Sequence, residues 1–211
     1  MLVGAAAIVG AVVSRLDQTA ASSTTVSSFD SAPEHPLEDA PAPEAIPLGA
    51  PDEPVHESDD PVTHADGDLP DGATSSDREY PGVANLDLEL LHALGAATAD
   101  AATDGVEIRV NSGWRSERYQ SQLLRDAVVE YGSEEEAARW VATPDTSPHV
   151  SGNAVDIGDT DATAWLSEHG SAYGLCQIYA NESWHYELRP EAAEGGCAPP
   201  YPDPTHDPRM R

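Results

Sequence analysis

The sequence predicts one small α+β domain over residues 81–200, with a mostly antiparallel sheet flanked by helices. Segments with helical periodicity alternate there with short segments whose apolar residues follow a period of two. About 120 residues are also enough to bury one hydrophobic core. Finally, the Pro-rich and acid-rich composition of the preceding segment ends near residue 80. We therefore expect the folded domain to begin at residue 81.

The first two predicted elements lead to an arginine of interest. Leucines at helical spacing predict a helix at residues 86–103. Alternating apolar and polar residues predict a strand at residues 106–110, and Trp114 and Arg115 follow it closely. Arg115 is therefore expected at the exit of a strand.

Capping residues mark the next two predicted helices. Ser116 can cap a helix at residues 117–131, because its hydroxyl can accept a hydrogen bond from the first turn. Ser133 and Glu136 have the spacing of a capping box and predict a helix at residues 134–142.

The C-terminal half of the domain is predicted to supply most of the sheet. A short apolar strand at residues 154–157 carries Asp156 on one face. A helix at residues 161–169 follows, and two further strands are predicted at residues 175–179 and 184–188.

Two segments, residues 147–158 and 181–188, together hold the parts of a mononuclear zinc site. The imidazoles of His149 and His185 and the carboxylate of Asp156 can occupy three corners of a Zn²⁺ tetrahedron and leave the fourth for water. Glu182 lies three residues before His185 and is a candidate general base.

The spacing alone does not carry this prediction. In a chain with eight histidines and 38 acidic residues, a histidine followed seven positions later by an acid is expected roughly 1.4 times by chance. The setting of Asp156 is more informative, because a charge on an apolar strand needs a partner or a metal.

Each candidate has an ordinary explanation when it is taken singly. His149 fits a surface loop, His185 fits a buried core position, and Glu182 fits a turn. Their joint occurrence favours the metal site. Glu187, in contrast, is interpreted as an exposed acid of a strand.

Three motifs occur in a fixed order along residues 81–200. The pattern S-x-H-x-x-G-x-A-x-D is matched at Ser147, His149, Gly152, Ala154 and Asp156. The pattern E-x-W-H is matched at Glu182, Trp184 and His185. The pattern S-G-[YW]-R-S-x-x-x-Q is matched at Ser112, Gly113, Trp114, Arg115, Ser116 and Gln120, with Trp114 where tyrosine is more usual. With these motifs the chain resembles the zinc D-alanyl-D-alanine carboxypeptidases and dipeptidases of the VanY and VanX type.

The resemblance implies a hedgehog/DD-peptidase-like fold, bound Zn²⁺ and a peptidoglycan stem peptide as substrate. It implies zinc ligation by His149, Asp156 and His185, a general base at Glu182, an oxyanion partner at Arg115 and substrate contacts at Ser147 and Gln120. Arg115 could instead pair with one of the many carboxylates, and Ser147 and Gln120 have capping or packing alternatives.

Four functions are compatible with these residues. Removal of the terminal D-alanine from a stem peptide is the first choice. The alternatives are a D-Ala-D-Ala dipeptidase, a peptidoglycan endopeptidase and a non-catalytic module that binds cell wall or stores zinc. Analysis of the released products would separate them.

The charge of the chain excludes some partners. All ten basic residues are arginines, and 38 acidic residues give a formal net charge of -28. Electrostatic attraction to nucleic acid or to an anionic membrane surface is therefore not expected.

The remaining organisation suggests export. Residues 1–15 contain an uncharged run and are expected to be a signal or membrane-anchor segment. Residues 16–80 are expected to be a disordered linker, and residues 201–211 a C-terminal tail. A disulfide between Cys176 and Cys197 would agree with an extracytoplasmic location at the cell envelope. We expect a monomer.

Overall fold

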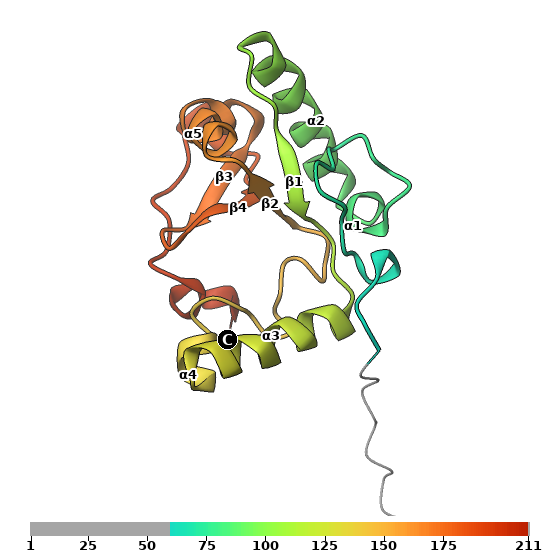
Figure 1. The fold of residues 1–211 in the computed structure, drawn as a ribbon. Coiled ribbons are helices and arrows are strands. Elements are labelled where there is room, and N and C mark those ends of the chain that lie inside the picture. The colour runs from blue at the N-terminus through green and yellow to red at the C-terminus, as the bar shows by residue number, and fades with distance from the viewer. Residues whose placement is uncertain (1–59, 211) are drawn as a thin grey trace, which may run out of the picture. The chain divides into compact units, whose positions relative to one another are not determined.

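The computed structural model describes residues 60–210 (Figure 1). The predicted signal or anchor segment, and the linker up to residue 59, lie outside the described residues. No helix in residues 60–210 is both long enough and apolar enough to cross a membrane.

A four-stranded antiparallel sheet forms the centre of the domain. Its strands are β1 (Arg109–Ser112), β2 (Ala154–Gly158), β3 (Leu175–Tyr179) and β4 (Glu182–Leu188), arranged in the order β1-β2-β4-β3. Every neighbouring pair is antiparallel. The predicted α+β class with a mostly antiparallel sheet is therefore confirmed.

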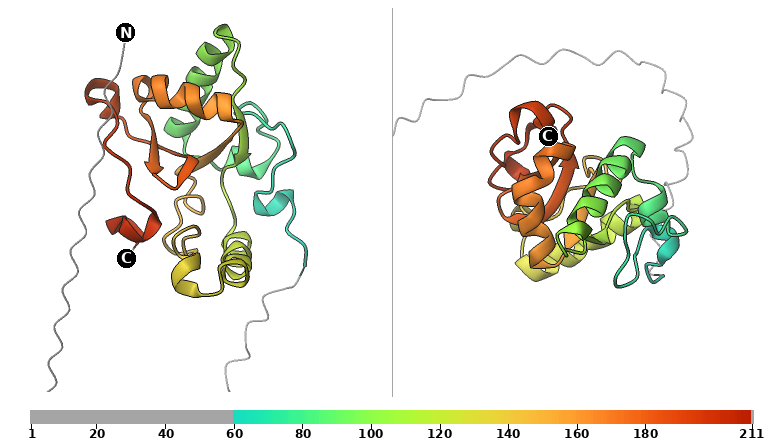
Figure 2. Two further views of the ribbon diagram at one scale, coloured as in Figure 1. Left: turned by 60° about the vertical axis from the view of Figure 1, so that its left-hand side comes forward. Right: turned by 90° about the horizontal axis from the view of Figure 1, so that it is seen from above.

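Helices lie on both sides of this sheet. In the described residues they are α1 (Pro81–Ala84), α2 (Leu88–Thr103), α3 (Glu117–Tyr131), α4 (Glu134–Ala137), α5 (Thr160–His169) and α6 (Ala192–Gly195). Short 3-10 turns are η1 (His64–Asp66), η2 (Gly170–Tyr173), η3 (Pro204–His206) and η4 (Pro208–Met210). Figures 1 and 2 show α2 and α5 on one side of the sheet, and α3 and α4 on the opposite side.

The hydrophobic core lies between the sheet and the pair α2 and α5. Leu90 and Leu94 of α2 pack in one buried cluster with Val155 and Ile157 of β2. Burial of a leucine side chain contributes about 1.5–3 kcal/mol, so this layer fixes β2 against α2. Successive residues of a strand face opposite sides. Asp156, between Val155 and Ile157, therefore faces away from the core, toward α3.

Several predicted boundaries agree with the structure. The helix at residues 117–131 is confirmed, with the Ser116 hydroxyl accepting from Tyr119 N at 3.1 Å. Its C-terminal cap, Gly132, has a φ of 82°, a left-handed conformation that glycine adopts at little cost. The strand at residues 175–179 is confirmed as well.

Two predicted elements differ most from the structure, and the strand predicted at residues 184–188 begins two residues earlier, at Glu182. The strand predicted at residues 106–110 is β1, which pairs only from Arg109 onward because its partner strand ends at Gly158, opposite Arg109. The helix predicted at residues 134–142 ends at Ala137. The chain then turns toward α3, where the Ala142 carbonyl accepts a hydrogen bond from Gln120 at 2.9 Å.

Residues 60–80, predicted as part of the disordered linker, have defined contacts with the domain. The carboxylate of Asp66 pairs with Arg118 of α3 and also accepts from the Ser116 hydroxyl at 3.1 Å. Gly67 lies so close to Trp114 that a Cβ atom would come within 2.0 Å of the Trp114 carbonyl oxygen. The prediction is corrected for residues 60–80, because these contacts attach them to the residues that follow β1.

The segment after β4 returns along the edge strand β3. Cys176 and Cys197 form a disulfide with Cα atoms 5.6 Å apart, which confirms the predicted bond. Tyr201 then pairs with Tyr179 in a parallel bridge. The predicted tail thus packs on the sheet, and the C-terminus lies on the same side as α3 and α4 (Figures 1 and 2).

Candidate metal centre and active site

Three side chains converge on the face of the sheet that points toward α3. Asp156 of β2 lies directly opposite His185 of β4 in the strand register, and the loop before β2 supplies His149. Asp156 Oδ1 lies 3.3 Å from His149 Nε2 and 3.4 Å from His185 Nδ1. The two ring nitrogens are 3.2 Å apart. The structure therefore brings together the three residues predicted as metal ligands.

A tight loop fixes the backbone of His149. The amide of Asn153 donates to the Pro148 carbonyl at 2.7 Å, and that of Gly152 donates to the His149 carbonyl at 3.1 Å. Gly152 has a φ of 75°, and a Cβ atom there would lie 2.4 Å from the Asn85 carbonyl oxygen. The glycine of the histidine motif is thus required by backbone conformation and by close packing.

The outer nitrogen of each histidine is already engaged. His149 Nδ1 lies 2.8 Å from the carbonyl oxygen of Gly113, and His185 Nε2 lies 3.2 Å from Glu187 Oε1. Because both oxygens accept hydrogen bonds, they hold an N–H on these outer nitrogens. When both rings are neutral, the lone pairs of His149 Nε2 and His185 Nδ1 therefore face each other beside Asp156.

This donor set fits a zinc ion. Two imidazole nitrogens and one carboxylate oxygen lie within 4.8 Å of one another, and all three residues are buried. Asp156 Oδ1 is buried and has no hydrogen-bond partner. A shared cation satisfies this oxygen and the two lone pairs at once, in the coordination that open zinc sites use.

The electrostatics of the three residues reflect their crowding. Burial and the charge of Arg115 lower the pKa of His149. Burial acts to raise the pKa of Asp156, but His149 and Arg115 outweigh it and hold this pKa well below its usual value. Burial acts to lower the pKa of His185, but the carboxylates of Asp156 and Glu187 raise it to about 9 when no metal is bound, and a metal ion would have to displace the proton from Nδ1. Asp156 is therefore a permanent anion between the two rings.

Arg115 contacts the other oxygen of the same aspartate. Its guanidinium donates to Asp156 Oδ2, to the Ser112 hydroxyl at 2.7 Å and to Gln120 Oε1 at 3.2 Å. The alternative pairing with a carboxylate, left open by the sequence, is thus observed, and its partner is a candidate metal ligand. Three of the five N–H groups of the guanidinium are used, and two are left for another acceptor.

Gln120, predicted to contact substrate, has both ends of its amide engaged by protein groups. Its oxygen accepts from Arg115, and its nitrogen donates to the Ala142 carbonyl. The side chain is 1 % exposed. Its contacts orient Arg115.

Glu182 stands at the start of β4 beside the histidines. Its Oε2 lies 3.7 Å from His185 Nδ1, and its Oε1 is buried without a hydrogen-bond partner. Burial raises the pKa of this carboxyl to about 7, against the opposing charges of His185 and Arg115. A carboxylate of this basicity is suited to accept a proton near neutral pH.

These residues share one cavity of about 190 Å³. Ser147 also lines it, and its buried hydroxyl has no hydrogen-bond partner. Trp184, at 40 % exposure, lies on its wall. The complete lining combines residues from the β1–α3 connection, α3, the α4–β2 connection, β2, β3, β4 and η3: Arg115, Gln120, Leu123, Trp140, Val141, Ala142, Ser147, Pro148, His149, Asp156, Tyr179, Glu182, Trp184, His185 and Pro204.

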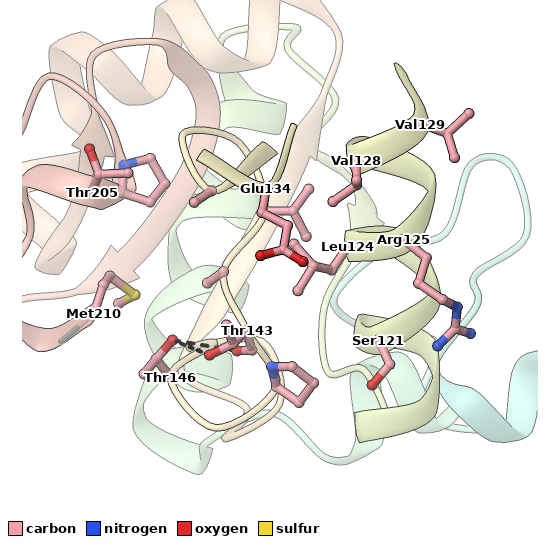
Figure 3. A pocket seen from close by; sticks show the side chains of 15 residues that line it. Ser121, Leu124, Arg125, Val128, Val129, Glu134, Thr143, Thr146, Thr205 and Met210 are labelled. Atoms are coloured by element: carbon pink, nitrogen blue, oxygen red, sulfur yellow. Dashed lines mark hydrogen bonds between the residues drawn. The ribbon is translucent and has the colours of Figure 1, made fainter. Parts of the chain in front are cut away.

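A larger cavity of about 880 Å³ adjoins the first, and Val141, Ala142 and Pro204 line both. Figure 3 shows it between α3 and the C-terminal segment, with the Glu134 carboxylate pointing inward and Met210 on the opposite wall. Its lining is mainly apolar and includes none of the predicted site residues. The predicted site residues therefore lie in the smaller cavity.

One residue next to the site was wrongly predicted from the sequence. Glu187, interpreted as an exposed acid, is 1 % exposed and contacts His185. Burial acts to raise its pKa, but hydrogen bonds from His185 and Arg209 lower it to about 2. Residues two apart on a strand face the same side, so its spacing from His185 was the available signal.

Comparison with known families agrees with this arrangement. The VanY family, described as D-alanyl-D-alanine carboxypeptidase, matches residues 84–191, just over half of the chain. The chain belongs to the VanY family. The matched range contains all the predicted metal ligands together with Glu182 and Arg115. The resemblance noted from the three motifs is confirmed.

One relative is similar in sequence over part of the chain. A D-alanyl-D-alanine carboxypeptidase of Enterococcus faecalis (strain ATCC 700802 / V583) is 32 % identical, and the alignment covers 41 % of each chain. The chain thus spans about two fifths of the length of this relative.

Two solved structures are similar at 27 % identity and a TM-score of 0.49 each. One is a mutant of the vancomycin-resistance D,D-pentapeptidase VanY from a VanB-type cassette in complex with Zn(II), and the match covers 53 % of this chain and 80 % of that one. The other is VanYB in complex with D-alanine-D-alanine, covering 53 % and 79 %.

Proposed function

We propose that this chain is a zinc-dependent carboxypeptidase that removes the terminal D-alanine from peptidoglycan stem peptides. The observation that carries the proposal is the convergence of two imidazoles, the carboxylate of Asp156 and the carboxylate of Glu182 in one cavity. Membership of the VanY family supports the substrate class.

His149, Asp156 and His185 would hold the zinc. When bound, this ion lowers the pKa of a coordinated water and polarises a carbonyl group. Gly113 and Glu187 keep the two rings in the orientation and tautomer that leave the inner nitrogens free.

Glu182 is the proposed general base. Its unpartnered oxygen accepts a proton from the attacking water and then returns it to the departing amine of the terminal residue. Its depth in the cavity supports this role, because burial raises its pKa to a value near neutrality.

Arg115 is the proposed partner of the oxyanion. Asp156, Ser112 and Gln120 hold its guanidinium at the cavity wall, so its remaining N–H groups are fixed before substrate arrives. Such preorganised donors stabilise the charge that develops on the carbonyl oxygen. Ser147 has an unpartnered hydroxyl and is the proposed polar contact to substrate.

Analysis of the products tests this function. The full-length chain is loaded with zinc and incubated separately with a stem pentapeptide, the corresponding tetrapeptide and D-Ala-D-Ala. We expect mass spectrometry to show loss of one D-alanine from the pentapeptide only. Hydrolysis of free D-Ala-D-Ala would support a dipeptidase, and cleavage within the stem an endopeptidase. Binding without hydrolysis would support a non-catalytic module.

We further infer an extracytoplasmic monomer at the cell envelope, with residues 1–15 as a signal or anchor and residues 16–59 as a linker. The disulfide between Cys176 and Cys197 supports this location, because such bonds persist mainly in oxidising compartments. Cell fractionation and N-terminal sequencing of the mature protein test it; a chain found with the cytoplasmic fraction would contradict it.

A further inference from the structure

The C-terminal segment reaches the residue that supports His185. Glu187 lies behind the His185 ring, on the side away from Asp156, and its Oε1 contacts His185 Nε2 at 3.2 Å. Both side chains are buried, with 3 % and 1 % exposure. The orientation of the His185 ring therefore depends on the position of the Glu187 carboxylate.

Arg209 holds that carboxylate with both arms of its guanidinium. Its Nη1 donates to Glu187 Oε2 at 2.6 Å, and its Nη2 donates to Glu187 Oε1 at 3.2 Å. Arg189 also donates to Glu187, but only to Oε2, at 2.7 Å. In residues 60–210, Arg209 is thus the arginine that contacts the oxygen facing His185.

Arg209 is itself fixed from the other side. Both oxygens of Asp207, which is fully buried, accept from Arg209 Nε at 3.0 Å. The Tyr179 hydroxyl donates to Asp207 Oδ2 at 3.2 Å, and the Tyr179 ring lies 5.0 Å from the His185 ring. Contacts run from His185 through Glu187, Arg209, Asp207 and Tyr179 and back to His185. This closed circuit of contacts connects the C-terminal segment with the candidate metal centre.

We propose that Arg209 is a positioning residue for the metal ligand His185 and acts through Glu187. The proposal rests on the metal centre of the proposed function. A two-armed pairing fixes the plane of a carboxylate more firmly than a single contact. Glu187 in turn fixes the tautomer and rotation of His185, which determine how well Nδ1 can ligate a metal. Asp207 and Arg209 are thus part of the support of the site.

The test compares substitutions in the full-length chain. Zinc affinity is measured by competition with a chromophoric chelator, and the Co²⁺-loaded protein is examined by visible absorption. We expect R209Q to weaken zinc binding about tenfold, the lower end of the range for outer partners of metal ligands. The Co²⁺ spectrum should shift as well. R209K should weaken zinc binding less than R209Q, because lysine keeps the positive charge but cannot make the bidentate contact of a guanidinium.

A matched control is a second contact that anchors the same C-terminal segment. Arg139 pairs with the buried Asp203 at 3.1 Å, but neither residue contacts His185, Glu187 or Arg209. R139Q removes an anchor of the segment without touching the circuit, so its zinc affinity should stay within twofold of the wild type. An equal loss in R139Q and R209Q would overturn the proposal, since general loosening of the segment would then be the cause.

A double-mutant cycle asks whether Arg209 acts through Glu187. E187Q alone should weaken zinc binding, and R209Q should cause no further loss in that background. Full additivity would overturn the proposal. If R209Q does not fold, R209K takes its place in the cycle, and a zinc affinity of R209K equal to that of the wild type would overturn the proposal.

These zinc-binding measurements need no substrate, so a zinc-binding protein that fails to hydrolyse peptide contradicts only the proposed function. A wild type that binds no zinc overturns both proposals.

Discussion

Asp156 and His185 lie directly opposite each other on the antiparallel strands β2 and β4. This register brings Asp156 Oδ1 within 3.4 Å of His185 Nδ1, although 28 intervening residues contain α5 and β3. The sheet therefore sets the separation of two of the three candidate ligands.

Loss of either histidine should remove the metal. His149→Ala or His185→Ala takes one of two nitrogen donors from a site with three protein ligands, so we expect no stoichiometric zinc and no hydrolysis. Elemental analysis of the purified variants measures the zinc. His92→Ala, at an exposed position on α2, is the control and should retain one zinc per chain. Active wild-type protein without zinc would contradict the ligand assignment.

Removal of the proposed general base should separate chemistry from binding. Glu182→Gln keeps the size of the side chain but cannot accept the proton of water, so turnover should fall by roughly 10²–10⁴. Zinc content should be unchanged, and kcat and KM with stem pentapeptide are the measurements. Glu130→Gln makes the same change at an exposed position of α3 and should behave as the wild type. A wild-type rate in Glu182→Gln would mean that Glu182 is only a turn acid.

The pairing of Asp66 with Arg118 should make stability depend on acid pH. A hydrogen bond from Arg118 lowers the pKa of Asp66 from 3.8 to about 2. The folded state therefore favours the ionised carboxylate, and its contribution is complete above pH 4 and lost as the pH falls toward 2.

Asp66→Asn should accordingly lower the free energy of unfolding by about 1 kcal/mol at pH 6 and by much less at pH 2. Denaturant unfolding at both pH values measures the difference. Asp126→Asn, at an exposed position of α3, serves as the control. A loss of equal size at both pH values would show that the charge of Asp66 does not contribute.

The disulfide should stabilise the region behind the candidate centre. The bond closes a loop that contains β4, with a sequence separation of 21 residues, and loop-closure entropy gives about 3 kcal/mol for a loop of this length. Replacing both Cys176 and Cys197 with serine should lower the melting temperature of oxidised protein. Reduction of the wild type should produce a similar decrease, while the double variant should not respond to reductant.

The sequence predicted best those elements whose signals are local. Helix α3 has a capping serine at Ser116 and a glycine at Gly132, and both bounds were predicted correctly. The bounds of β1 were not, because its first paired residue depends on where β2 ends, almost fifty residues later.

The candidate site shows the same contrast between local signals and long-range contacts. The candidate ligands and Glu182 were predicted because they occur in short motifs, whereas Glu187 and Arg209 are 22 residues apart and their pairing exists only in the fold. Residues 60–80 have the composition of a linker, and the contact that orders Asp66 comes from Arg118, 52 residues away. Composition could not reveal either contact.

The strand order has a consequence for how this protein can change over evolutionary time. β2 and β4 are the two inner strands, so Asp156 and His185 belong to the part of a sheet that opens least readily. The remaining cavity walls include α3 and residues 140–148, which lie outside the sheet. Under the proposed function, substitutions in those walls would alter which peptide is accepted while the geometry of the candidate ligands is conserved. We therefore expect peptide preference and metal binding to be separable in this architecture.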